Sequence, residues 1–161
     1  MPIAKKEHWP LEVIVAVTST EAKGVSSSKG MECSRLTSPY YKAWLRDAAA
    51  DFTTASDAIN SKDFAALGAV AELSCLKMHS VMLTSRPTLS YWTPASITCM
   101  DRVRELRAKG NDVFFTVDAG PQIKAVCLPS SADAVADALS KTPGVIKVIR
   151  STLGDGARVL E

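Results

Sequence analysis

The stretch that most constrains the fold is residues 113–128, in which an acid and a tight turn separate two apolar segments. Residues 113–117 are β-branched and aromatic, which predicts a short buried strand, and residues 123–128 resume the strand pattern. Gly120 and Pro121 require a turn, because glycine adopts backbone angles that other residues resist and proline fixes φ. Asp118 therefore lies at the corner of a predicted hairpin. It either caps the turn, as Asp commonly does, or faces a cleft.

Composition indicates one globular domain over residues 1–161. The chain is 47% hydrophobic and 22% charged with a net charge of +2, and its basic residues are scattered rather than interleaved with aromatic ones. No apolar stretch of membrane length and no signal-peptide pattern stands out. We therefore expect a cytoplasmic protein with neither a nucleic-acid nor a membrane partner.

The four cysteines favour packed, reduced thiols over a metal site. Cys33, Cys75, Cys99 and Cys127 are widely spaced, form no CxxC pair, and accompany only two histidines. We expect no metal to bind them.

A hydroxyl-rich segment, residues 23–31, is the second feature with chemical potential. It contains Ser26, Ser27 and Ser28 with two glycines and two lysines, and without apolar periodicity it predicts a loop. Such a loop can offer N–H groups, hydroxyls and ammonium groups to an anion. A solvated serine-rich turn is the alternative explanation.

The remaining pattern places helices between strands at both ends of the chain. His79 lies beside the apolar stripe of a long helix, and we interpret it as a packing residue rather than a catalyst. This order predicts an α+β fold, with an antiparallel sheet of four or five strands covered by helices mainly on one face. The expected strands are 11–17, 113–117, 123–128, 145–149 and 158–160. The expected helices are 39–47 after Ser38, 52–59, a long one after Ser61 with apolar positions from 64 to 82 that closes near Arg86-Pro87, one after Thr93 that stops at Lys109-Gly110, and one after Ser130 or Ser131 that ends near 140.

Five segments in order give the chain its resemblance to a known family. They are His8-Trp9-Pro10, residues 25–31, Thr37-Ser38, Met78-His79 and residues 115–121, of which Thr-x-Asp-Ala-Gly-Pro is the most specific. Together they resemble the C-terminal half of diphosphomevalonate decarboxylase, a member of the GHMP kinase superfamily. The resemblance implies a ferredoxin-like α+β domain, and no segment here is similar to the family's ATP phosphate loop.

The resemblance also implies a function and its residues. The family uses ATP and magnesium to convert mevalonate 5-diphosphate to isopentenyl diphosphate. The resemblance implies that Asp118 is the catalytic residue and that Ser26, Ser27 and Ser28 contact the phosphorylated mevalonate. Two positions depart from the family pattern: Gln122 stands where the family usually has Asn, and Ser28 where some bacterial members have Arg.

The chain is expected to be incomplete as an enzyme. We expect an N-terminal ATP-binding half in cis or trans and no ATP or magnesium binding by this chain alone. A second copy of the chain, in a homodimer, is a further candidate partner. The alternatives are a non-catalytic anion-binding or dimerisation module of this fold, or part of a related phosphomevalonate decarboxylase or mevalonate kinase.

Overall fold

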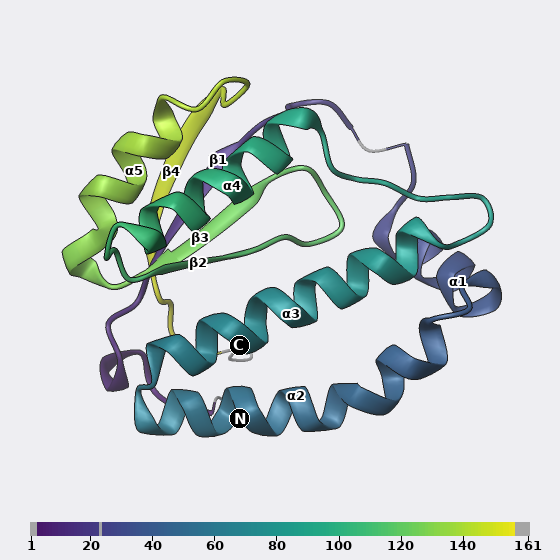
Figure 1. Ribbon diagram of the computed structural model, residues 1–161, viewed down its shortest axis with the longest axis horizontal. Helices are drawn as coiled ribbons and strands as arrows, with labels where there is room; N and C mark the ends of the chain where they lie inside the picture. Colours follow the sequence, from purple (N-terminus) through teal and green to yellow (C-terminus); the bar gives the residue numbers. More distant parts are fainter. Residues whose placement is uncertain (1–2, 23, 157–161) are drawn as a thin grey trace, which may run out of the picture.

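Four strands form one antiparallel sheet in the computed structural model, which describes residues 3–22 and 24–156 (Figure 1). The strand order is β2–β3–β1–β4, and every neighbouring pair is antiparallel. This arrangement confirms the predicted fold class. The strands span Glu12–Val17 (β1), Val113–Thr116 (β2), Ile123–Cys127 (β3) and Lys147–Thr152 (β4).

The last part of the chain differs from the prediction. Strand β4 begins two residues later than the expected 145–149, because a turn through Gly144, with φ +85°, occupies the preceding residues. In that turn the Val145 N–H donates to the Thr142 carbonyl at 3.1 Å. The strand expected over 158–160 lies outside the described residues.

Helices α4 (Pro94–Ala108) and α5 (Ala132–Ser140) pack over one face of the sheet (Figure 1). Alternate residues of a strand point to opposite faces, so each strand contributes every second side chain to this core. Five of the fully buried members are Ile14, Phe115 and Ile123 from the sheet, Val103 from α4, and Val135 from α5. This core fixes the end of β2, which Asp118 follows.

Helices α2 (Tyr41–Ser61) and α3 (Phe64–Leu83) form an antiparallel pair beside β2 (Figure 1). Lys62, with φ 57°, makes the left-handed turn between them. The Phe64 and Phe114 rings lie 5.3 Å apart, so α3 also covers the second face of the sheet at β2. Farther along that face Ile149 of β4 is 46% exposed. Helices therefore cover mainly one face, as predicted.

By length and composition α3 could cross a membrane, and it is the one such helix among residues 3–22 and 24–156. The expectation that no stretch has membrane length is thus wrong. In this structure α3 packs against α2 and β2, with Leu67, Val81 and Met82 buried. Core helices of soluble proteins pass the same test, so it is weak grounds for a membrane span.

One continuous helix, α2, replaces the two helices expected over 39–47 and 52–59. Residues 48–50 are alanines, and alanine is the best helix former, so the segment between the two predicted pieces stays helical. Ser38 does not cap α2, whose N-cap is Tyr40. The Ser38 hydroxyl bonds the Thr84 hydroxyl at 2.8 Å and accepts the Tyr40 N–H, just before the helix, at 3.3 Å.

The helix caps were predicted with mixed success. Thr93 caps α4 as expected and forms a reciprocal capping box with Ser96. Asp63, not Ser61, caps α3, since α2 continues through Ser61. Ser131 precedes α5 but makes no side-chain cap; its hydroxyl accepts the Asp112 N–H at 2.9 Å.

Candidate active site

The serine-rich segment is the start of a helix rather than a loop. Helix α1 spans Ser27–Thr37, and the Ser26 hydroxyl accepts the Lys29 N–H at 3.4 Å as its N-cap. Serine is favoured at a helix N-terminus because its hydroxyl satisfies an N–H group that the helix leaves open. The loop prediction for residues 23–31 is therefore wrong from Ser27 onwards. Ser26, Ser27 and Ser28 are all exposed at the positive end of the α1 dipole.

One pocket of about 650 Å³ brings together three of the four predicted site residues, and the fourth, Ser26, is not among the residues that line it. Its walls include Ser27 and Ser28 of α1 and Asp118, which follows the end of β2. Met78 and Met82 of α3 line the space between them. Residues about ninety positions apart in the sequence thus face one cavity that is wide enough for a small phosphorylated molecule.

Asp118 lies open in this pocket. Its side chain is 79% exposed, and Oδ2 accepts a hydrogen bond from the Lys124 ammonium group at 2.7 Å. The turn is closed by the backbone instead, where the Gly120 N–H donates to the Asp118 carbonyl at 2.7 Å. No side-chain cap by Asp118 is recorded among the described residues, so the capping explanation for this acid is not supported.

Residues 118–122 form the acid corner, and side chains from distant segments hold its far end. The Thr18 hydroxyl donates to the Pro121 carbonyl at 2.9 Å, and the Ser96 hydroxyl donates to the same carbonyl at 2.7 Å. The Gln122 side-chain amide accepts the Thr18 N–H at 2.6 Å and donates to the Ser19 carbonyl, also at 2.6 Å. No local pattern connects Thr18 or Ser96 to this corner, because the contacts depend on the tertiary fold.

Arg35 is the one cation among the residues that line this pocket. Its guanidinium makes two hydrogen bonds to the Glu32 carboxylate, at 2.8 and 2.6 Å, and these bonds lower the pKa of Glu32. Arg35 follows Ser28 by seven residues, two helical turns, so both lie on one face of α1. Predicting the segment as a loop hid this relation.

A second, more apolar pocket of about 490 Å³ opens beside the first between α2, α3 and the end of β2. Trp44 and Phe52 of α2 form one wall, and Met78 and Asp118 are shared with the first pocket. The acid corner therefore has a polar side toward α1 and an apolar side toward α2.

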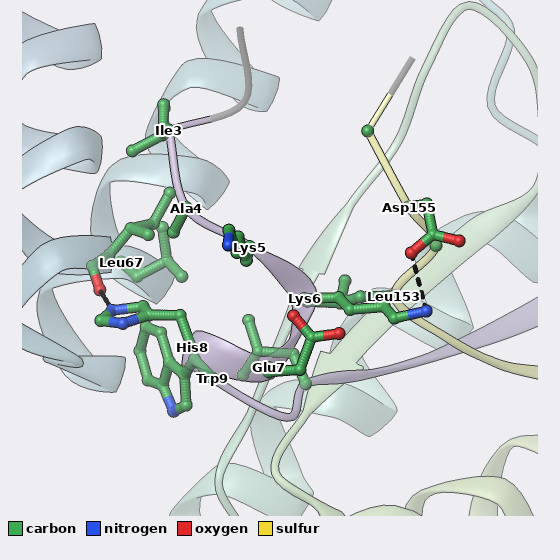
Figure 2. Close-up of a pocket in the computed structure, with 14 residues that line it drawn as sticks. Ile3, Ala4, Lys5, Lys6, Glu7, His8, Trp9, Leu67, Leu153 and Asp155 are labelled. Carbon is green, nitrogen blue, oxygen red and sulfur yellow. Dashed lines mark hydrogen bonds and ion pairs between the residues drawn. The ribbon is translucent and has the colours of Figure 1, made fainter. Parts of the chain in front are cut away.

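A third pocket, of about 750 Å³, shares no lining residue with the two pockets beside Asp118 (Figure 2). It is lined by residues 3–9, by the α2 and α3 ends, and by residues 153–156. Lys6 and Asp155 form an ion pair across it at 2.7 Å, and His8 Nε2 donates to the Ile59 carbonyl at 2.9 Å. None of the predicted site residues lines it.

Among residues 3–22 and 24–156 no group of three or more His, Cys, Asp or Glu side chains is arranged to hold a metal ion. All four cysteines are free thiols, and burial raises the pKa of Cys99 and Cys127 to about 11. These thiols are protonated at neutral pH and serve packing.

Comparison with protein-family models shows which family the chain belongs to. The model for the mevalonate 5-diphosphate decarboxylase C-terminal domain matches residues 13–159. The chain belongs to this family. The diphosphomevalonate decarboxylase of Aspergillus fumigatus is 30% identical over 151 residues, which cover 91% of this chain and 36% of that protein.

Solved structures agree with the assignment of this decarboxylase-family chain. Mevalonate diphosphate decarboxylase from Staphylococcus aureus superposes with a TM-score of 0.86 at 32% identity, over 97% of this chain and 47% of that one. A complex of MDDEF with MVAPP, AMPPCP and magnesium has a TM-score of 0.85 at 32% identity, over 92% and 46%. The chain thus spans about a third of the curated relative and just under half of the solved chains.

Proposed function

We propose that this chain is the C-terminal, substrate-binding part of an ATP-dependent decarboxylase that converts mevalonate 5-diphosphate to isopentenyl diphosphate, with Asp118 as its catalytic carboxylate. The observation that carries the proposal is the pocket of about 650 Å³ between α1 and the end of β2, which Asp118 lines together with Ser27 and Ser28. Membership of the decarboxylase family supports it, as does a related structure with MVAPP bound.

The residues suit the two ends of such a substrate. A tertiary hydroxyl is a poor nucleophile until its proton is accepted, and the exposed Asp118 carboxylate can accept or orient that proton. The Ser27 and Ser28 hydroxyls at the α1 N-terminus would bind the diphosphate, because anions are favoured there. Binding the tail holds the hydroxyl beside Asp118 and supplies binding energy remote from the reacting carbon.

When bound, ATP supplies the phosphoryl group and magnesium neutralises its charge. The described residues contain no cluster suited to the metal, so we assign both to a complementary ATP-binding half, joined in cis or in trans. A homodimer and a cytoplasmic location complete the proposal. Asp118 is the one group of this chain that we assign to the chemical step.

The test joins this chain to an ATP-binding half from a family relative and measures isopentenyl diphosphate formation. We expect turnover with mevalonate 5-diphosphate, and none when Asp118→Asn removes the charge but keeps the size. Turnover of mevalonate 5-phosphate instead would indicate a phosphomevalonate decarboxylase, and phosphorylation of mevalonate would indicate a mevalonate kinase. A folded Asp118→Asn variant with wild-type turnover would remove Asp118 from the mechanism.

A further inference from the structure

Helix α3 supplies hydrogen-bond partners to the open edge of β2. Glu72 Oε1 accepts the Phe115 N–H at 3.1 Å, and Cys75 Sγ accepts the Val117 N–H at 3.3 Å. His79 Nε2 lies 3.0 Å from the Val117 carbonyl oxygen. Residues 72, 75 and 79 follow each other at steps of three and four, so one face of the helix takes the place of a neighbouring strand.

The contact between His79 and Val117 defines the state of the imidazole. A carbonyl oxygen only accepts hydrogen bonds, so Nε2 carries the proton and donates it. Burial lowers the pKa of His79, which keeps the ring neutral at physiological pH. The Trp92 ring lies 4.5 Å from the imidazole and supports it from another side. His79 is 2% exposed and lines neither pocket beside Asp118.

Val117 is the residue immediately before the proposed catalytic carboxylate of Asp118, and α3 holds both of its main-chain groups. Its carbonyl accepts from His79 and also from the Cys75 thiol, at 3.5 Å. Beyond the acid, Thr18 and Ser96 hold the Pro121 carbonyl. The acid corner is therefore fixed on both sides of Asp118, while the Asp118 side chain is exposed.

We propose that His79 is a positioning residue for Asp118: its hydrogen bond to the Val117 carbonyl sets where the main chain delivers the carboxylate into the pocket. The role rests on the proposed function of Asp118. His79 touches no substrate in this arrangement and acts only through the backbone. Small displacements matter, because a misplacement of about 1 Å can cost about a hundredfold in rate.

The variants separate the hydrogen bond from the packing. His79→Phe keeps an aromatic ring against Trp92 but removes the donor. His79→Gln retains an N–H near the Nε2 position and should rescue. His79→Asn, whose shorter amide cannot reach the carbonyl, is a second donor-loss variant in case the Phe variant does not fold. The control is His8→Phe, because His8 also bonds a main-chain carbonyl, that of Ile59, but far from the acid corner.

Two readouts are needed. The first is amide hydrogen exchange of Val117 and Gly120 in this chain, measured by NMR. We expect about tenfold faster exchange in His79→Phe, near wild-type rates in His79→Gln, and no change in His8→Phe. The second is kinetics of the chain joined to an ATP-binding half. There we expect kcat to fall about 10- to 100-fold in His79→Phe, with KM for mevalonate 5-diphosphate within about threefold.

The outcomes decide between the alternatives. Wild-type exchange and kcat in His79→Phe would overturn the proposal, as would failure of His79→Gln to rescue either. An equal kcat loss in His8→Phe would show that general destabilisation, and not positioning, is responsible. If the joined wild-type enzyme shows no turnover, the proposed function fails, but the exchange rates still decide whether His79 fixes the acid corner.

Discussion

At the scale of single residues, Asp118 and Ser27 should affect different kinetic constants in the joined enzyme. We expect Asp118→Ala to lower kcat by about two to four powers of ten, the range for a positioned acid–base group, with a smaller effect on KM. Ser27→Ala should raise KM roughly tenfold with little change in kcat, since it removes a contact shared by ground and transition states. Steady-state kinetics check both.

Ser140→Ala is the matched control for the serine variant. Ser140 is an exposed helical serine on α5 whose hydroxyl donates to the Asp137 carbonyl, and it lines none of the pockets near Asp118. It should leave both constants unchanged. If Ser27→Ala lowers kcat and leaves KM unchanged, the assignment of substrate binding to Ser27 and of the chemical step to Asp118 is wrong.

His79 should make the fold sensitive to acid. Its pKa is lowered in the folded chain, chiefly by burial, so the unfolded chain binds its proton more readily. This contribution to stability is fully present above the unfolded pKa of about 6.5 and is lost as pH falls below that value. Urea unfolding at pH 7.5 and 5.5 measures the difference. His79→Gln should reduce the acid destabilisation, and an unchanged difference would show that other groups cause it.

At the scale of elements, Gly68 sets how closely α3 approaches β2. A Cβ at this position would lie 3.1 Å from two atoms of Phe114, tighter than normal packing allows. We expect Gly68→Ala to destabilise the fold by about 1–2 kcal/mol, because overpacking exceeds the gain of about 1 kcal/mol in helix propensity. Ala69→Gly, on the exposed side of α3, should cost about 1 kcal/mol through propensity alone. Denaturant unfolding compares them, and a stabilised Gly68→Ala would contradict the close contact.

The pair of Glu12 and Arg150 joins β1 to β4. The guanidinium donates to both carboxylate oxygens of Glu12, lowering the pKa of that buried acid, and it also contacts Asp133 of α5 at 2.6 Å. Arg150→Met should lower the denaturant midpoint of unfolding, since Glu12 would be left without its charged partner. In a double-mutant cycle Glu12→Gln should recover part of that loss. Strict additivity would show that the pair is not coupled.

The sequence predicted elements well where local chemistry dominates. The Thr93 cap, the stop at Gly110 and the two strands around Asp118 depend on signals within a few residues. The start of α1 was missed because a serine run is typical both of loops and of helix N-termini. Asp118 and the serines could be named only through motif resemblance. Thr18 and Ser96 join the site through tertiary contacts that no local pattern reveals, whereas Arg35 was missed because its helix was predicted to begin as a loop.

At the scale of the whole molecule, the chain alone should not bind ATP. No segment resembles a glycine-rich phosphate loop followed by a helix. The pocket that Asp118 and the serines line has one cationic residue among its lining residues, Arg35, which is already paired to Glu32. Calorimetric titration with magnesium-ATP should show no heat of binding, while the joined enzyme should bind it. Micromolar binding by the isolated chain would mean that it contains a nucleotide site of its own.

The bonds around the acid corner also have a consequence for folding order. They draw on the end of β1, the C-terminal half of α3, the first turn of α4 and the start of β3, segments separated by up to about a hundred residues. Contacts of such long sequence separation form only after large loops have closed. A nascent or partly unfolded chain can therefore contain every helix and still lack a placed carboxylate. We therefore expect the carboxylate to reach its place only in the final step of folding, after the sheet and the helices around it have assembled.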